Sequence, residues 1–445
     1  MDFSGLGPSA VQPSLIERAI LRREILPWAL LGVTLGLVEG ATAAVLVKET
    51  FAGAASPTSV NVAVSLVSGA PAMANVVSFA WANIAHGRAR VQLVVALQAL
   101  FALFVGLVGL APSAAGGLVF AVMSILLART LWAGVLTVRA SVWISNYPRR
   151  VLARITGRIV TLSSLTVAAS AALAATVLGT GRVEARWLYG LASLCGLLAA
   201  WLYRHTRVRR EFQLLQAETR VLRRSEPFSL AMLRQILRED PDYRSYMSWM
   251  AIYGAGNLML VPILVVLMTD HLGIPAAQQI ALLSVVPLAA LPLAIPAWAR
   301  LFEGVHIVEY RALQSWAMVA AMVLLFCPAF FGWPNLLWLG AVALGAALAG
   351  ANLGWNLGHN DFAQPGRAQH YMGVHVTLTG VRGMFAPSIG ILCYELLESW
   401  HAGSGRFALL LPFTLTVAGA FGFGLQAEQL RARGALVQSQ KKYKP

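Results

Sequence analysis

Residues 371–397 read YMGVHVTLTGVRGMFAPSIGILCYELL. The segment is apolar and exceeds the length of about 20 residues that a helix needs to cross a bilayer. Arg382 lies near its middle, and an arginine at that depth is costly and is by default a sign of a functional site. Gly380, Gly383 and Pro387 interrupt the regular pattern. The stretch therefore predicts a membrane-spanning helix that contributes to a functional site.

The rest of the chain has the same apolar character. Of its 445 residues, 58% are hydrophobic and 12% are charged, and the mean hydropathy is +0.67. Soluble domains contain about 25% charged residues, so the composition predicts an integral membrane protein. The cysteines lie in apolar runs without CxxC spacing and are interpreted as small buried hydrophobic residues. We expect no metal site and no cofactor.

Apolar stretches of spanning length recur along the chain and predict twelve transmembrane helices. Six fall in an N-terminal bundle within residues 25–204, and six in a C-terminal bundle within residues 246–427. Between them, residues 205–245 alternate Arg with Glu and Leu, and we expect amphipathic helices on the membrane surface. The expected spans cover residues 26–47, 58–82, 92–111, 117–143, 159–179, 187–203, 246–269, 276–298, 312–332, 335–358, 371–397 and 406–426.

The two ends of the chain carry their own signals. Ser14 and Glu17 have the spacing of a capping box, which predicts the start of a helix. With its arginines, the segment 1–24 is interpreted as an amphipathic helix on the cytoplasmic membrane surface. Residues 428–445 form a basic cytoplasmic tail.

Basic residues predict the orientation of the spans. An even number of spans puts both termini on one side, and 27 of the 34 Lys and Arg residues fall on that side. This count includes Arg300 and Arg311, which we expect in the connection after the eighth span. Only four fall on the opposite side. Because cytoplasmic loops carry the excess of Lys and Arg, we expect cytoplasmic termini in a bacterial inner membrane. Orientation also explains the net charge of +15, so no nucleic-acid partner is needed.

A sequence repeat relates the two bundles. Gly157 and the run 160–163 (VTLS) recur as Gly373 and the run 376–379 (VTLT), an offset of 216 residues. Further matches follow in the same order at an offset of 216 or 217 residues. Two parallel repeats of six spans are typical of transporters whose halves rock about a site at the bilayer midplane. The further matches are Ser68 and Pro71 with Ser284 and Pro287, 80–82 with 297–299, and 96–98 with 312–314.

With this organisation the chain resembles the major facilitator superfamily over essentially its whole length. Gly87, Arg88 and Arg90 match the loop motif that follows the family's second span, although the acidic residue of that motif is missing here. The copy after the eighth span contains Glu303. The resemblance implies secondary transport by alternating access, with these loop residues in gating. Asp361, at the cytoplasmic mouth of the tenth span, is a further gating candidate.

Three charged residues are expected near the midplane. At 1.5 Å per residue, Glu39, Arg129 and Arg382 lie roughly 16–20 Å into their spans. One interpretation makes Arg129 and Arg382 the donors for an anionic substrate group and Glu39 the proton-coupling residue. The other makes Glu39 and Arg129 an internal ion pair that braces the first and fourth spans. The sequence leaves both open.

Several polar residues near these charges are candidates for the same site. His375 lies two helical turns before Arg382 on the same face, so it is expected either to titrate during transport or to pack as a hydrogen-bonded residue. Substrate binding and helix–helix hydrogen bonding are equal alternatives for the amides and the indole nearby. Glu395 is expected at the outer membrane interface. The amide and indole candidates are Asn257, Asn352, Trp355 and Asn356.

The function predicted from these residues is secondary active transport of a small organic, anion-bearing solute, coupled to protons or another ion. The chain lacks a Walker sequence and a catalytic grouping, so neither ATP drive nor enzyme activity is expected. A proton-linked exporter of amphipathic compounds is the nearest alternative. A non-transporting or lipid-handling membrane protein of the same fold is another. The cargo and the direction of transport stay open, and we expect a monomer surrounded by membrane lipids.

Overall fold

The computed structural model describes residues 14–180, 184–209, 211–213, 215–216, 229–363 and 367–436. Within these ranges all regular structure is helical. Eleven helices are long and apolar enough to cross a membrane, and one bent helix pair makes a twelfth span. The predicted all-α, twelve-span fold is therefore confirmed. Residues 437–445 of the predicted basic tail lie outside the described residues.

The N-terminal bundle begins with the predicted capping box, in which Ser14 and Glu17 exchange hydrogen bonds. The helix that follows does not end at the membrane surface, because it continues through Pro27 into the first span. The helices of this bundle are α1 (Leu15–Gly36), α2 (Gly40–Phe51), α3 (Pro57–Met73), η1 (Ala74–Val77), α4 (Ser78–Ala85), α5 (Arg90–Val108), α6 (Ala115–Asn146), α7 (Arg149–Thr180) and α8 (Ala185–Tyr203).

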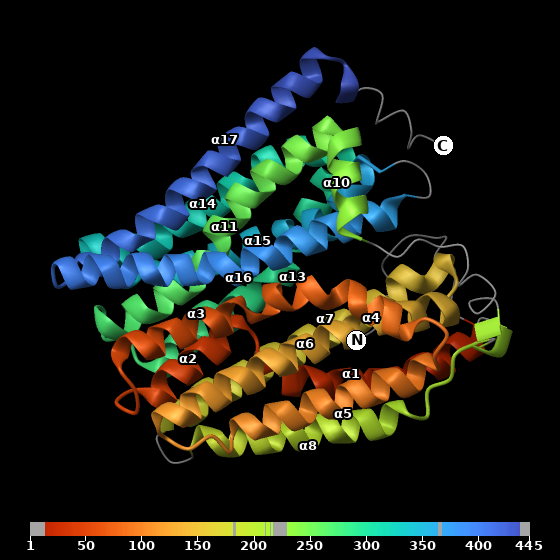
Figure 1. Ribbon diagram of the computed structural model, residues 1–445, viewed down its shortest axis with the longest axis horizontal. Coiled ribbons are helices and arrows are strands. Elements are labelled where there is room, and N and C mark those ends of the chain that lie inside the picture. The colour runs from red at the N-terminus through yellow and green to blue at the C-terminus, as the bar shows by residue number, and fades with distance from the viewer. Residues whose placement is uncertain are drawn as a thin grey trace.

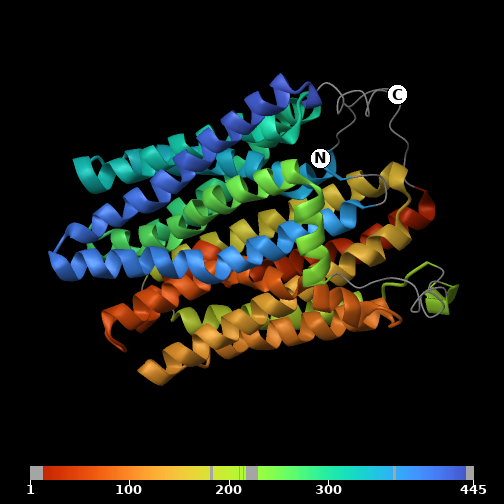
Figure 2. The same cartoon turned by 45° about the horizontal axis from the view of Figure 1, so that its top comes forward.

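The C-terminal bundle follows a short amphipathic helix, α10 (Leu230–Glu239), which occupies part of the predicted linker. Helix α10 runs across the ends of the long helices rather than along them (Figure 2). A π-helical turn, η2, interrupts the eighth span. The remaining elements are α11 (Pro241–Asp270), α12 (Ala276–Ile280), η2 (Ala281–Val285), α13 (Val286–Gly304), α14 (Ile307–Phe331), α15 (Leu336–Leu357), η3 (Gly358–Asp361), α16 (Ala368–Trp400), η4 (Ser404–Leu409) and α17 (Leu410–Ala432).

The two bundles repeat the same packing scheme. Helix α1 packs on α7 and α8, and its counterpart α11 packs on α16 and α17. Likewise α5 lies against α6 and α8, while α14 lies against α15 and α17. The 216-residue sequence repeat is therefore matched by a structural one.

The bundles meet along two seams, where α3 packs on α16 and α11, and where α7 packs on α12 and η2. The glycines of the 371–397 stretch make the first seam possible. A β-carbon on Gly383 would lie 2.5 Å from the Ala72 side chain, and one on Gly380 would lie 2.6 Å from the Val76 backbone nitrogen. Larger residues would force α3 and α16 apart.

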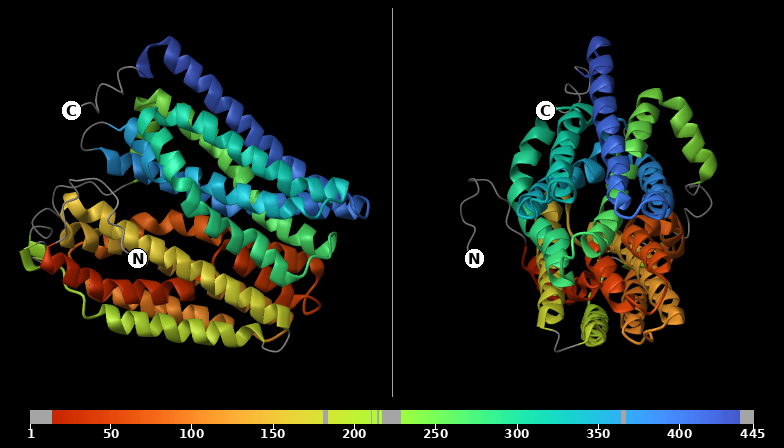
Figure 3. Two further views of the ribbon diagram at one scale, coloured as in Figure 1. Left: turned by 180° about the vertical axis from the view of Figure 1, so that it is seen from behind. Right: turned by 90° about the vertical axis from the view of Figure 1, so that its left-hand side faces the viewer.

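The molecule has two ends, toward which the long helices of both bundles run. We call the end where α1 begins and α17 stops the terminal end, and the opposite one the far end. Figure 1 shows the two bundles close together at the far end and drawing apart toward the terminal end, and the view from behind shows the same divergence (Figure 3).

Candidate functional site

The first span is broken where the predicted proton-coupling residue lies. Helix α1 ends at Gly36, α2 starts at Gly40, and their axes differ by 42°. Gly40 has a φ of +28°, which a glycine adopts without strain. Glu39 is the extended residue just before α2, so the break exposes its carboxylate to the neighbouring helix α6. Sequence analysis predicted one continuous span here.

Glu39 forms an ion pair with Arg129 of α6, with an Nη1–Oε2 distance of 2.6 Å. The Arg129 side chain is 8% exposed and the Glu39 side chain is 37% exposed. The internal ion pair, one of the two alternatives that the sequence left open, is thus present in this conformation. It fixes the break in the first span to α6 and neutralises the cation of Arg129.

Arg382 of α16 points between helices of its own bundle. Its guanidinium donates to the main-chain carbonyl of Met250 in α11, and to Oγ1 of Thr379 at 2.7 Å. It lies on Gly254, where a β-carbon would come within 2.8 Å of the Arg382 Cζ atom. Gly254 is therefore the position in α11 that makes room for a buried cation.

A second buried cation, Arg311 of α14, was missed by the sequence analysis. It is 1% exposed, and it donates to Gln314 Oε1 at 2.8 Å and to the carbonyl of Ala351 at 3.3 Å. Its guanidinium packs on Gly354 of α15, where a β-carbon would lie 2.9 Å away. Sequence analysis placed Arg311 in a polar loop because hydropathy rises only after it.

Asp361 explains why α14 begins five residues earlier than predicted. Its Oδ2 accepts the main-chain N–H of Ile307 at 2.7 Å, and the His306 side chain accepts the N–H of Val308. Together they satisfy two of the free donors at the start of α14. Asp361, predicted to act in gating, thus caps a helix in this structure.

Arg311 and Arg382 have no acidic partner among the described residues. Among the described residues, neither Arg311 nor Arg382 has a carboxylate within salt-bridge distance. The buried hydroxyl of Tyr246 in α11 interacts electrostatically with both. Their remaining contacts are to neutral acceptors. The C-terminal bundle therefore holds two positive charges that nothing in the described chain neutralises.

Two of the predicted site residues gather beside Arg382. The indole N–H of Trp355 lies 3.4 Å from Thr379 Oγ1, the same atom that accepts from Arg382. The His375 ring lies 5.4 Å from that of Trp355, between centroids. His375 is 2% exposed, and neither of its ring nitrogens has a hydrogen-bond partner among the described residues.

The three predicted amides lie nearby but point elsewhere. Asn257 Oδ1 lies 3.5 Å from Thr416 Oγ1, a contact between α11 and α17. Asn352 and Asn356 are exposed on α15, and the Asn356 amide donates to the Asn352 carbonyl at 2.8 Å. The two asparagines of α15 therefore present polar groups to the surroundings of that helix.

The remaining predicted gating residues, Arg88, Arg90 and Glu303, lie near the terminal end. Arg88 and Glu303 are exposed, and Arg90 is the first residue of α5 and is half-buried. Polar contacts between the bundles occur elsewhere, at positions that sequence reasoning did not select.

Those contacts form a cluster at the far end. Lys48 of α2 pairs with Asp270 of α11 at 2.9 Å and donates to Asn61 of α3 at 2.7 Å. Asn61 and Thr58 in turn donate to the carboxylate of Glu395 in α16, each at 2.6 Å. Glu395 is therefore a bridge between the bundles rather than a residue turned to the membrane interface. We call these five residues the far-end bridge.

Two more polar contacts join the bundles, closer to the middle of the molecule than the far-end bridge. Thr42 donates to Ser284 at 2.9 Å, and the hydroxyls of Ser65 and Ser388 lie 3.2 Å apart. These contacts and the far-end bridge lie in the same half of the molecule.

Comparisons with known proteins agree with this geometry. The chain matches the nucleoside transporter NupG (12% identity, TM-score 0.69, 93% of this chain and 99% of the other). A bacterial homologue of the human lysosomal transporter Spinster, inward-facing and occupied, matches at 13% identity and TM-score 0.66 (94% and 98%). The xylose transporter XylE from E. coli, partially occluded and inward open, matches at 13% identity and TM-score 0.64 (92% and 97%).

No protein-family model matches the sequence. No curated protein matches it either. At such low identities the matched structures establish the fold, which is the twelve-helix fold of these transporters.

Proposed function

We propose that this chain, which has the major facilitator superfamily fold, is a secondary transporter of a small organic solute carrying an anionic group. One observation carries the proposal. Arg311 is buried and Arg382 is half-buried in one bundle, and neither has a carboxylate partner among the described residues. Uncompensated buried charges are costly. A carboxylate or phosphate of a bound solute would lower that cost.

The matched structures support the transport part of the proposal. NupG transports nucleosides, XylE transports xylose, and the third is a bacterial homologue of the lysosomal transporter Spinster. These proteins do not share one cargo, and the class of solute proposed here follows from the charges of this chain.

The far-end bridge supports a particular state of the transport cycle. Alternating access closes one end of the molecule while the other is open. Here the polar contacts between bundles lie toward the far end, and the helices diverge toward the terminal end (Figure 1). With both termini in the cytoplasm, as the distribution of Lys and Arg indicates, the state is inward-facing. The membrane is then the bacterial plasma membrane.

The ion pair in the N-terminal bundle supports a coupling step. A proton that binds Glu39 removes its negative charge and leaves Arg129 without a partner. The released guanidinium can then attract the anionic group of the solute, so that proton and solute bind together. His375, buried beside Arg382, is a second candidate for the proton.

A binding screen followed by transport tests the proposal. The purified protein is first screened by thermal shift against matched pairs of solutes, an organic carboxylate or phosphate beside its neutral amide or alcohol. Anionic members are expected to stabilise the protein. The best solute then enters a proteoliposome uptake assay with Arg311→Gln, Arg382→Gln and, as an exposed control, Arg234→Gln.

Arg311→Gln and Arg382→Gln are each expected to reduce the uptake rate at least tenfold, and Arg234→Gln is expected to leave the uptake rate unchanged. Stabilisation by lipophilic cations alone, with normal export by both Arg variants, would favour the exporter of amphipathic compounds. Glu39→Gln separates coupling from binding, because it should bind the solute without responding to a pH gradient.

A further inference from the structure

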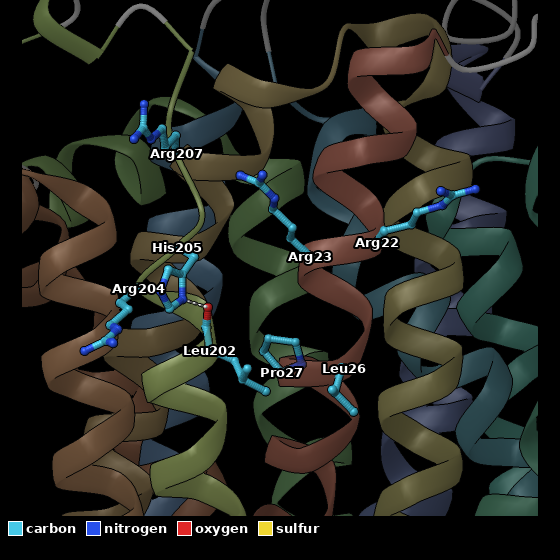
Figure 4. Close-up of a pocket in the computed structure, with 8 residues that line it drawn as sticks. All are labelled: Arg22, Arg23, Leu26, Pro27, Leu202, Arg204, His205 and Arg207. Carbon is cyan, nitrogen blue, oxygen red and sulfur yellow. Dashed lines mark hydrogen bonds between the residues drawn. The ribbon is translucent and has the colours of Figure 1, made fainter.

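A basic cavity lies at the terminal end of the N-terminal bundle, away from the transport site. It has a volume of about 860 Å³ and lies between the start of α1 and the segment that follows α8. Arg22 and Arg23 line it from α1, and Arg204, His205 and Arg207 line it from the other side (Figure 4). In this view Arg23 extends from α1 toward the segment that carries Arg207. Four arginine residues thus belong to the lining of one cavity.

These positive charges are not neutralised within the cavity. None of the described residues that line it is acidic. The nearest acid in α1, Glu24, is fully buried and turned inward, where it accepts from Trp143 at 3.1 Å and from Tyr147 at 2.9 Å. The cavity is therefore free to bind an anion of its own.

The backbone around the cavity is held in place. Asn146, fully buried at the end of α6, donates to the carbonyl of Arg207 at 3.1 Å and accepts the N–H of Arg209 at 2.9 Å. This clamp fixes the segment after α8, so that binding does not have to order it. A preformed site loses less conformational entropy on binding than a flexible loop does.

The base of the cavity is apolar and continues onto the surface of the bundle. Leu26, Pro27 and Leu202 line the side toward the membrane. Below Leu202, the exposed face of α8 is a row of large apolar side chains that includes Trp201 and Leu198. A ligand with a phosphate and acyl chains would contact both the basic lining and the apolar surface, whereas free phosphate would contact only the basic lining.

We propose that this cavity binds the phosphate headgroup of an anionic phospholipid, with the acyl chains along α8. Guanidinium groups bind phosphate through paired hydrogen bonds, and basic pockets beside membrane helices suit such headgroups. Arg204, whose guanidinium lies 4.9 Å above the Trp201 ring, marks the boundary between headgroup and chains. The site is separate from the solute site and does not depend on which solute is transported.

Lipid titrations of the full-length protein test this assignment. Purified protein in a neutral detergent is titrated with phosphatidylglycerol, phosphatidylcholine or inorganic phosphate, and bound species are counted by mass spectrometry of the intact complex. The test variant is Arg23→Gln with Arg207→Gln. The matched control, Arg234→Gln with Arg238→Gln on α10, removes the same charge from exposed positions at the same end. A charge-preserving variant, Arg23→Lys with Arg207→Lys, controls for misfolding caused by substitution at these two positions.

Phosphatidylglycerol should bind the parent protein, and phosphatidylcholine should not. Each basic residue near a membrane surface contributes about fivefold in affinity, so the test variant should bind about 30-fold more weakly. The control and the lysine variant should bind within about twofold of the parent. Equal binding by the test variant, or equal binding of phosphatidylcholine, would overturn the proposal. Displacement of the lipid by excess inorganic phosphate would overturn the lipid part and leave a site for soluble phosphates.

Discussion

Removal of the Lys48 amine should favour opening of the far end of the molecule. Lys48 is the only cation in the far-end bridge, and its side chain is 8% exposed. It pairs with both oxygens of Asp270, at 2.9 and 3.0 Å, and with Asn61 at 2.7 Å. In Lys48→Ala, the Asp270 carboxylate and the Asn61 carbonyl both lose a donor that comes from the N-terminal bundle.

The size of the effect follows from these contacts. Asp270 is 33% exposed, so its pairing with Lys48 is partly screened by solvent and contributes about 0.2–1 kcal/mol. The hydrogen bond from the ammonium to Asn61 lies within the N-terminal bundle, so it is kept when the far end opens and adds nothing to the difference. The closed far end should thus lose about 0.2–1 kcal/mol relative to the open one. Since 1.4 kcal/mol is tenfold, the ratio of closed to open molecules should fall by a factor of roughly 1.4 to 5.

Disulfide cross-linking between the bundles measures that ratio. The hydroxyls of Ser65 and Ser388 lie 3.2 Å apart across the seam of α3 and α16, so cysteines at these positions should cross-link when the far end is closed. The native cysteines at 195, 327 and 393 are first replaced by alanine. Cross-linking with a mild oxidant should be rapid in this background and slower, by up to about fivefold, after Lys48→Ala.

Two further variants make the result specific. Glu49→Ala alters an exposed neighbour that is outside the far-end bridge, and it should cross-link at the parental rate. The exchanged pair, Lys48→Asp with Asp270→Lys, should recover most of the lost rate because it restores an ion pair between the bundles. If Lys48→Ala cross-links as fast as its parent, the far-end bridge does not hold the bundles together and the reasoning is refuted.

Three other predictions can be checked by thermal unfolding. Gly254→Ala should displace the Arg382 guanidinium from the Met250 carbonyl and lower the free energy of unfolding by about 1.5–3 kcal/mol. Its control is Gly190→Ala, where an added β-carbon would have no neighbouring atom within 4 Å, and this variant should have the same Tm or a slightly higher one. Asp361→Ala removes the acceptor of the Ile307 N–H and should lower the free energy of unfolding by about 1 kcal/mol. Asp361→Asn keeps an acceptor oxygen and should lower it less. Burial lowers the pKa of His306, so the unfolded chain binds a proton at a higher pH than the folded one does. The free energy of unfolding should therefore fall as the pH drops below about 6.5. His306→Asn should flatten that part of the plot of stability against pH, and an unchanged plot would show that His306 is not the cause.

Much of the fold could be predicted because it follows from hydropathy and repetition. A span must be apolar over a fixed length, so the expected spans can be counted from the sequence. The offset of 216 residues between Gly157 and Gly373 then indicated two equivalent bundles. Their packing bears this out, since α1 and α11 contact corresponding partners. These signals are spread over many residues, and errors at single positions do not change them.

The site could be predicted less well because it depends on single residues and helix ends. Hydropathy cannot detect the break between Gly36 and Gly40, since the flanking residues stay apolar. Arg311 was counted as a loop charge because the capping acceptor of its helix, Asp361, comes from 54 residues away in the chain. The far-end bridge was missed because Lys48 and Glu395 look like ordinary interfacial charges until the bundles are brought together.

The repeat also shows where the two bundles were made different. Arg382 corresponds to Thr166, and the two residues pack in the same way, each against a glycine of the first helix in its bundle, Gly254 and Gly32. The glycine contact is therefore part of the shared frame, whereas the charge is particular to the C-terminal bundle.

Arg311 and its neighbour Gln314 make the same point. Gln98, the counterpart of Gln314, is fully buried, and its amide has no hydrogen-bond partner among the described residues, while Gln314 accepts from Arg311. Arg311 itself corresponds to Val95. The N-terminal bundle thus holds a neutral pair, Glu39 with Arg129, and the C-terminal bundle holds two unpaired cations. On this division of charge, the anionic part of the solute would bind the C-terminal bundle, and the proton would act by opening the pair in the other.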